Sequence, residues 1–180
     1  MFDYTLWRVY TSDINLILAA IPIMLVVWSV IGAVFYRRMR VVGAALAVLA
    51  AALILYKTII SRGSSEAGID LIPFSSFVRA RTNPEMYREM LMNVLLFIPL
   101  GLSLPFVIGG GIAKRILLTV LAGFLLTVTV EAVQCFVSIG LAETDDVICN
   151  TLGALLGSLA YSLSMLWRRL FAKKTERENN

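Results

Sequence analysis

The sequence contains no histidine and very little charge, and both absences narrow the possible functions. Of its 180 residues only 16% are charged, whereas 59% are hydrophobic and the mean hydropathy is +0.83. Without histidine, catalytic triads, His-based zinc sites and haem ligation by histidine are excluded. A soluble domain has about 25% charged residues, and a chain this short cannot bury so much apolar surface in a water-soluble core. The composition therefore predicts a membrane protein.

The basic residues do not indicate binding to nucleic acid, although the chain carries a net charge of +4. They lie at the ends of apolar segments, where basic residues set membrane topology. We therefore expect no nucleic-acid partner. The two cysteines, Cys135 and Cys149, lie in apolar sequence and are expected to be unpaired.

Five apolar segments have the length that a membrane-spanning helix requires, about 20 residues. The chain is therefore predicted to be an all-α, polytopic integral membrane protein with one domain over residues 1–180. The first segment lacks the cleavage pattern of a signal peptide, so we expect a membrane anchor. A polar tail over residues 173–180 is expected to be flexible and cytoplasmic. The five segments cover about residues 14–35, 41–60, 84–105, 112–136 and 146–171.

The third segment carries signals for its start and its end. Asn83 can cap a helix, Pro84 presets the backbone angle of the first turn, and Glu85 places an acid there. Pro105 is expected to end the helix.

The long connection between the second and third segments contains a second apolar stretch, over residues 69–78. Ten residues are too few to cross the bilayer, so we expect an interfacial or re-entrant segment. A plain surface loop is the alternative.

The distribution of charge predicts the orientation of the chain. If the five spans alternate, basic residues accumulate on one side of the membrane, whereas acids outnumber them on the other. Positively charged loops remain in the cytoplasm, so the N-terminus should face out and the C-terminus in. The basic residues on the predicted cytoplasmic side are Arg37, Arg38, Arg40, Lys114, Arg115, Arg168, Arg169, Lys173, Lys174 and Arg177.

Several polar residues fall inside the spans, towards the predicted outer leaflet. Thr127, Glu131 and Gln134 share one helical face, and an acid within hydrocarbon needs a partner or a proton. On the last span, polar residues and a glycine pair, Gly153 and Gly157, form one stripe that would let another helix approach closely. We expect one outward-opening polar pocket lined by Asn93, Glu131, Gln134, Asp145, Asp146 and Asn150.

The residues alone leave the role of this pocket open. Intramembrane amides and acids often only hydrogen-bond helices together. Alternatively, Glu131 could serve as a general acid or base of a lipid-modifying enzyme, with Asp145 and Asp146 as ligands of a divalent cation, or could titrate in a lipid carrier or flippase. Without such a cation we expect no cofactor. Membrane lipids are the expected partners, with Arg79, Arg81 and Arg88 holding an anionic head group or only snorkelling into solvent.

Four sequence blocks over about residues 69–160 resemble the VanZ-like family, in the family's order. The blocks are Asp70-Leu-Ile-Pro73-Phe74, Asn93-Val-Leu-Leu-Phe97-Ile-Pro99-Leu-Gly101, Glu131-Ala-Val-Gln134, and the run from Asp145-Asp146 through Asn150-Thr151 and Gly153 to Gly157. The resemblance implies a multi-pass protein of the bacterial plasma membrane that lowers susceptibility to glycopeptide antibiotics of the teicoplanin type. These drugs act outside the cytoplasm on cell-wall precursors. Our first hypothesis is therefore that the protein acts at the outer leaflet, through the polar pocket, on a lipoglycopeptide or on a lipid-linked cell-wall precursor.

Two positions depart from the family's pattern. Relatives commonly carry an arginine just before the acidic run, where this chain has Gly140, and an aspartate where it has Glu143. The missing arginine puts a phosphate- or carboxylate-binding role at that position in doubt, whereas Glu143 keeps the charge.

Overall fold

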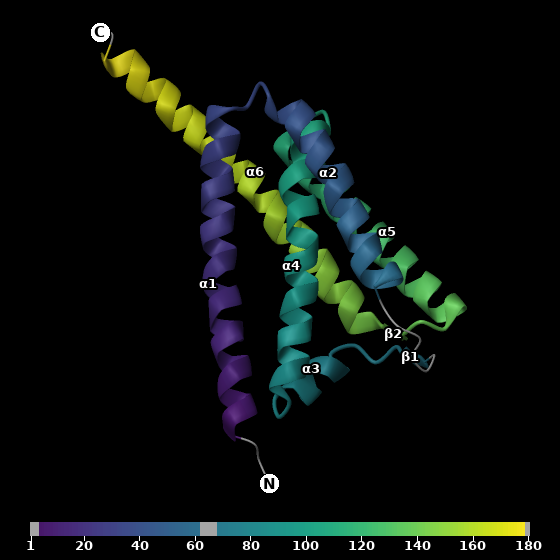
Figure 1. Cartoon of the computed structure of the whole chain (residues 1–180). Helices are drawn as coiled ribbons and strands as arrows, with labels where there is room; N and C mark the ends of the chain where they lie inside the picture. The colour runs from purple at the N-terminus through teal and green to yellow at the C-terminus, as the bar shows by residue number, and fades with distance from the viewer. Residues whose placement is uncertain (1–3, 62–67, 179–180) are drawn as a thin grey trace.

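Five long helices form a bundle, and one of its ends carries a short helix and two short strands (Figure 1). In this computed structural model the backbone is described for residues 4–61 and 68–178, and the side chains for residues 12–61 and 68–174. The long helices are α1 (Tyr4–Val34), α2 (Met39–Leu55), α4 (Pro84–Val107), α5 (Ile112–Val137) and α6 (Thr144–Glu178), and a π-helical turn, η1 (Tyr56–Ile60), extends α2.

Each of the five long helices is long and apolar enough to cross a membrane, so the predicted five-span, all-α architecture is confirmed. The candidate spans agree with the segments expected from the sequence to within a few residues. They are Ser12–Val34, Met39–Ile60, Pro84–Val107, Ile112–Val137 and Thr144–Lys174.

The predicted start of α4 is confirmed, whereas its predicted end is wrong. The side chain of Asn83 accepts hydrogen bonds from the N–H groups of Glu85 and Met86, at 3.1 and 3.5 Å. The helix continues past Pro105 to Val107. Proline removes the hydrogen bond of its own nitrogen only, and the Ile108 N–H still donates to the Leu104 carbonyl at 3.0 Å.

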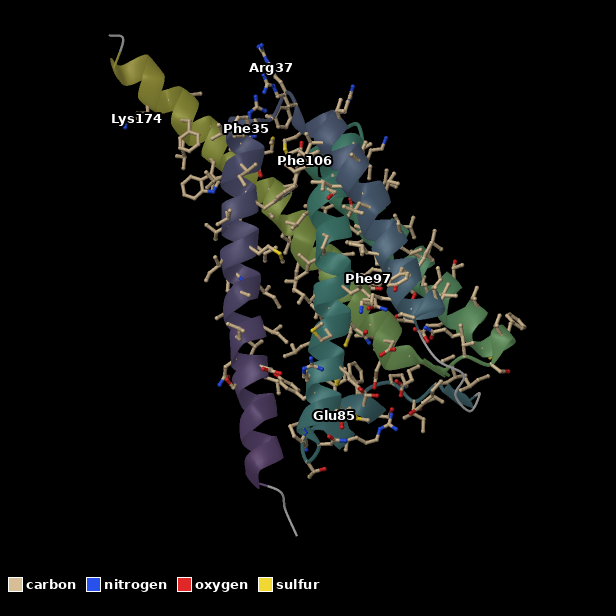
Figure 2. The ribbon with its side chains drawn as sticks, in the orientation of Figure 1. Phe35, Arg37, Glu85, Phe97, Phe106 and Lys174 are labelled. Atoms are coloured by element: carbon tan, nitrogen blue, oxygen red, sulfur yellow. The ribbon has the colours of Figure 1, made fainter. Side chains whose placement is uncertain are left out.

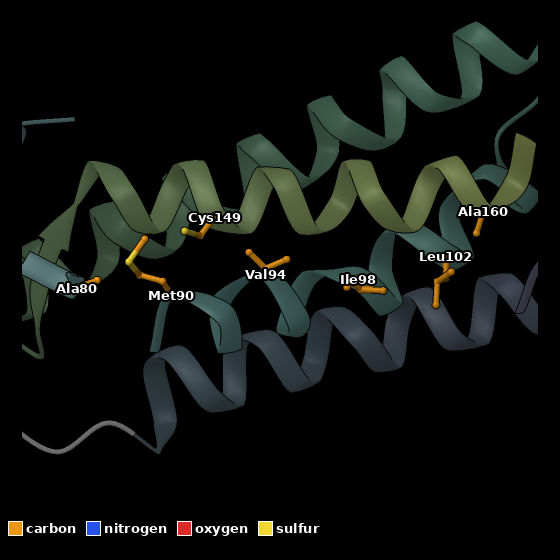
Figure 3. Packing of buried hydrophobic residues seen from close by; sticks show 7 residues of the cluster. All are labelled: Ala80, Met90, Val94, Ile98, Leu102, Cys149 and Ala160. Atoms are coloured by element: carbon orange, nitrogen blue, oxygen red, sulfur yellow. The ribbon is translucent and has the colours of Figure 1, made fainter. Parts of the chain in front are cut away.

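Helix α4 is the central element of the bundle. Met90, Val94, Ile98 and Leu102 recur every four residues along α4, beside α6 (Figure 3). They are buried against α6 and against α1. Another part of its surface packs against α2 and α5, where Phe97 is fully buried. With neighbours on several sides, α4 has 56% of its span buried, against 17% for α1.

The glycine pair on α6 allows a close approach to α4, as the sequence predicted. A Cβ atom on Gly153 would overlap the carbonyl oxygen of Val94, and one on Gly157 would overlap that of Ile98. Small residues at such positions let helix backbones pack tightly inside a membrane.

Residues 69–78, expected to be interfacial or re-entrant, remain at one end of the bundle (Figure 1). They contribute to a strand, β1 (Gly68–Asp70), and to a six-residue helix, α3 (Ser75–Ala80). Strand β1 pairs in parallel with β2 (Leu141–Glu143), and this pairing was not predicted. The apolar side chains of the segment are exposed, as at a membrane interface: Ile69, Leu71, Ile72, Phe74, Phe77 and Val78.

The polar tail after residue 173 continues α6 as helix to Glu178. Lysine, arginine and glutamate are good helix formers, which accounts for the helix over these residues. That the tail is flexible and cytoplasmic remains a prediction. Figure 2 shows Arg37 and Lys174 at one end of the bundle and Glu85 at the other. This separation of charge agrees with the arrangement on which the predicted orientation rests.

Candidate functional site

A cavity of about 460 Å³ lies among α2, η1, α4, α5 and α6, near the end that carries the strands. Five of the six residues predicted to form a polar pocket line it. Asp145 is the exception. Apolar side chains of α2 and α4 form the rest of its wall, so the cavity is polar on one side and apolar on the other. The five polar residues are Asn93, Glu131, Gln134, Asp146 and Asn150.

Helix α5 contributes its polar face to the cavity, and Thr127, Glu131 and Gln134 are all buried there. The Gln134 amide Nε2 donates to the carbonyl oxygen of Thr58 at 2.8 Å. Carbonyls near the end of a helix lack a partner within the helix, so Gln134 both satisfies the end of the second span and joins it to α5.

Two more hydrogen bonds join the spans around the cavity. Asn150 Nδ2 donates to the Thr127 hydroxyl at 2.9 Å, which connects α6 to α5. Asn93 Nδ2 donates to Asp146 Oδ1 at 2.7 Å, which connects α4 to α6. The bond from Asn93 fixes the side chain of Asp146 on the cavity wall.

Glu131 connects the cavity to the strands at the end of the bundle. Its Oε2 atom accepts a hydrogen bond from the backbone N–H of Glu143 in β2, at 3.1 Å. Only 8% of the Glu131 residue is exposed. The buried carboxyl group thus has the hydrogen-bond partner that its burial requires. A change in its charge would alter the strength of its bond to β2.

The cavity contains hydrogen-bond acceptors that the described residues leave unused. A carbonyl oxygen can only accept hydrogen bonds, so it is the NH₂ group of the Gln134 amide that faces the Thr58 carbonyl. The amide oxygen, Oε1, takes no part in this bond. Gln134 Oε1 and Asn150 Oδ1 are buried and have no hydrogen-bond partner among the described residues. An unpaired buried acceptor costs about 1–3 kcal/mol, which a ligand would recover only if its N–H or O–H groups displaced the atoms that now cover these oxygens.

Asp145 lies outside the cavity and caps helix α3. Its two carboxylate oxygens accept from the N–H groups of Phe74, at 2.6 Å, and Ser76, at 2.7 Å. Phe74 has a positive φ of 66°, a conformation that costs a bulky residue roughly 1–2 kcal/mol, and the bond to Asp145 helps to hold it.

A divalent cation at Asp145 and Asp146, which the lipid-modifying-enzyme alternative requires, remains a hypothesis. Both oxygens of Asp145 are used by backbone N–H groups. In the described part of the chain, no three His, Cys, Asp or Glu side chains lie close enough together to hold a metal ion.

The three arginines predicted to bind an anionic head group do not line the cavity. Arg79 forms ion pairs with Asp70 at 3.0 Å and with Glu143 at 3.2 Å, and so joins α3 to both strands. Arg88 lies 3.6 Å from Asp13 on α1. Arg81 is exposed. Their binding to a head group remains a prediction.

The acids beside Arg79 have opposite pKa shifts. The Ile72 N–H and the Ser75 hydroxyl donate to Asp70 and, with Arg79, lower the pKa of its carboxyl below the ordinary value of 3.8. Burial raises the pKa of Glu143 above its ordinary value of 4.5, although Arg79 acts in the opposite direction.

The sequence analysis did not predict that residues of the second span line the cavity. Lys57 and Thr58 of η1 line the cavity together with Ala50 and Leu53 of α2. A lysine at the end of a span ordinarily indicates only snorkelling, so its position carried no signal of a site. Cys135 and Cys149 are free, as predicted.

These features define the class of the protein: an α-helical, multi-pass membrane protein with a cavity, polar on one side, among four of its five spans. A family model described as VanZ/LLP1 matches residues 42–168, and the chain belongs to this family. The match extends beyond residues 69–160, the range that carries the sequence motifs.

A curated relative, Protein VanZ of Enterococcus faecium, is 40% identical over 80 residues. The aligned part covers 43% of this chain and 47% of the relative, so the chain spans about half the length of that protein. No solved structure matches the chain.

Proposed function

We propose that this protein resides in the bacterial plasma membrane and lowers susceptibility to glycopeptide antibiotics of the teicoplanin type. In this proposal it holds an amphiphilic molecule, a lipoglycopeptide or a lipid-linked cell-wall precursor, at the outer leaflet. Membership of the VanZ/LLP1 family and the similarity to Protein VanZ support the phenotype. The observation that carries the proposal is the cavity with its buried, unused acceptors.

The polar side of the cavity favours a ligand rich in hydrogen-bond donors. Glu131 and Asp146 bring carboxylates, and Gln134 and Asn150 bring amide oxygens without partners among the described residues. The sugar hydroxyls and peptide N–H groups of a glycopeptide or of a cell-wall precursor supply such donors.

Beside the apolar side of the cavity lies a separate hollow that suits a hydrocarbon chain. This hollow, of about 220 Å³, lies among α1, α2 and α4 and shares Ala50, Leu53 and Pro99 with the cavity. Its two polar side chains are already paired: Trp28 Nε1 donates to the Leu102 carbonyl at 3.0 Å, and Ser103 donates to the Pro99 carbonyl at 2.7 Å. A ligand there gains by burying apolar surface. Cavity and hollow together fit a polar head with an acyl chain.

Expression in a susceptible bacterium tests this function. We expect the wild-type protein to raise the inhibitory concentration of teicoplanin several-fold and to change that of vancomycin, which lacks an acyl chain, much less. Asn150→Leu removes a cavity acceptor and should abolish the protection. Asn15→Leu is the matched control, because Asn15 is exposed on α1 and lines neither the cavity nor the apolar hollow beside it.

Membrane abundance of each variant is measured by immunoblot, so that loss of folding is recognised. Gln134→Met, which nearly conserves volume, repeats the test if Asn150→Leu is not produced. Equal inhibition by teicoplanin with and without the wild-type protein would refute the proposed function, as would full protection by both cavity variants.

A further inference from the structure

Two further hollows, lined by arginines, lie at the opposite end of the bundle from the cavity, at the end where Figure 2 shows Arg37 and Lys174. One hollow, of about 440 Å³, lies between the α1–α2 turn, the start of α5 and the last part of α6. A neighbouring hollow of about 420 Å³ shares Tyr36 and Arg168 with it. The cations that line one or both are Arg37, Arg38, Arg115, Arg168 and Arg169.

Two of these arginines are held in place by tyrosine rings. The guanidinium carbon of Arg168 lies 3.8 Å from the ring centre of Tyr36, and that of Arg115 lies 5.2 Å from the ring centre of Tyr161. Such stacking is worth about 0.5–1 kcal/mol at exposed sites. The two tyrosine hydroxyls lie 3.4 Å apart, so both cations are fixed on one aromatic platform.

Backbone carbonyls orient Arg115 further. Its Nε donates to the Gly110 carbonyl and its Nη1 to the Pro105 carbonyl, both at 2.7 Å. The guanidinium is therefore positioned before any ligand binds, which lowers the entropy that binding costs.

The positive charge of this region is not balanced by the described side chains. Among the residues whose side chains are described, no acid lines either hollow, and none forms an ion pair with Arg115 or Arg168. Arginine guanidinium groups in a fixed arrangement match the oxygens of a phosphate. The region is thus complementary to a phosphate-bearing anion.

We infer that these two hollows bind the head group of an anionic phospholipid. Their position at the end of the spans, beside the exposed apolar residues Leu166 and Leu170, would let the acyl chains lie along α6. Basic pockets between spans are typical sites for phospholipid head groups. Arg168, which faces both hollows, is the central contact.

Lipid binding to the purified, full-length protein tests this inference. Native mass spectrometry and thermal unfolding are measured in detergent with added phosphatidylglycerol, phosphatidylcholine or inorganic phosphate. We expect phosphatidylglycerol to bind at least tenfold more tightly than phosphatidylcholine and to raise the unfolding temperature. Arg168→Gln should remove most of this preference, and Arg168→Lys, which keeps the charge but not the planar stack, should remove part of it.

Arg40→Gln is the matched control, because Arg40 is an exposed cation of the same end that lines neither hollow. It should retain the preference. An equal loss of the preference for phosphatidylglycerol in Arg40→Gln and Arg168→Gln would overturn the inference, because it would show a diffuse attraction between the basic end of the protein and anionic lipid. Equal binding of the two lipids to the wild type would also overturn it. An equal thermal shift with inorganic phosphate would show an anion site rather than a lipid site.

Discussion

Gly153 sets the distance between α6 and α4 at the level where the cavity lies. A Cβ atom at this position would overlap the Val94 carbonyl oxygen, and backbone atoms cannot move aside as the tip of a flexible side chain can. Overpacking of this kind costs typically 1–3 kcal/mol.

We therefore expect Gly153→Ala to lower the free energy of unfolding by about 1–3 kcal/mol, measured by thermal or denaturant unfolding in detergent. Gly109→Ala is the control, since a Cβ there meets nothing within 4 Å, its φ is not positive and it caps no helix. Equal stability of the two variants would show that α4 and α6 are not packed as described.

A substitution at Glu131 can distinguish the effect of its carboxyl group from the effect of the hydrogen bond that it accepts. A glutamine at this position can still accept the N–H of Glu143, which Glu131 accepts at 3.1 Å. We expect Glu131→Gln to unfold within about 1 kcal/mol of the wild type but to lose teicoplanin protection, because the cavity loses a carboxylate. Unchanged protection at normal abundance would limit Glu131 to a structural role.

At the scale of elements, β1, β2 and α3 form one unit through Arg79, and the pKa of Glu143 makes this unit sensitive to pH. Burial raises that pKa above 4.5 in the folded protein. The folded state thus holds the proton more tightly than the unfolded state does. The resulting stability is fully present below pH 4.5 and is lost as the pH rises through the raised value.

We expect Glu143→Gln, which cannot ionise, to gain stability relative to the wild type as the pH rises from 4 to 7. The difference between their unfolding temperatures, measured across this range, gives the sign. A difference that does not change with pH, or that changes in the opposite direction, would contradict the assignment.

The elements that could be predicted from the sequence are those with a long repeating signal. Twenty or more apolar residues identify a span, and the spacings of Thr127, Glu131 and Gln134 place them on one helical face. The paired strands were missed because three residues are too few for an alternating pattern, and the strands lie 73 positions apart in register.

Assignment of single side chains to the cavity was less accurate, for a geometric reason. Adjacent residues on a helix point about 100° apart, and here Asp146 faces the cavity while the side chain of Asp145 turns to the backbone of α3. Nothing in the sequence indicated that Asp145 would cap α3 or that Arg79 would pair with Asp70 and Glu143.

At the scale of the whole molecule, the separation of charge predicts which end lies outside the cell. Arg37 and Lys174 lie at one end and Glu85 at the other (Figure 2). Basic residues stay in the cytoplasm, so the end with the cavity and the strands should face out.

Single-cysteine variants of a protein without Cys135 and Cys149 test this orientation. We expect Ser61→Cys to react with a membrane-impermeant maleimide in intact cells, and Arg38→Cys to react only after permeabilisation, since both positions are exposed. The reverse pattern would place the cavity at the cytoplasmic leaflet and exclude the proposed action on extracellular drugs.

The bonds from Asp145 to Phe74 and Ser76 have a consequence for the order of biosynthesis. The residues they join are 71 and 69 positions apart, so the short helix cannot acquire its cap while the ribosome is still translating the earlier spans. A nascent chain that stops before Asp145 also lacks the glycine surface against which α4 packs. Maturation of the first four spans therefore waits for the fifth, and a quality-control protease would encounter an uncapped, loosely packed intermediate until translation is complete.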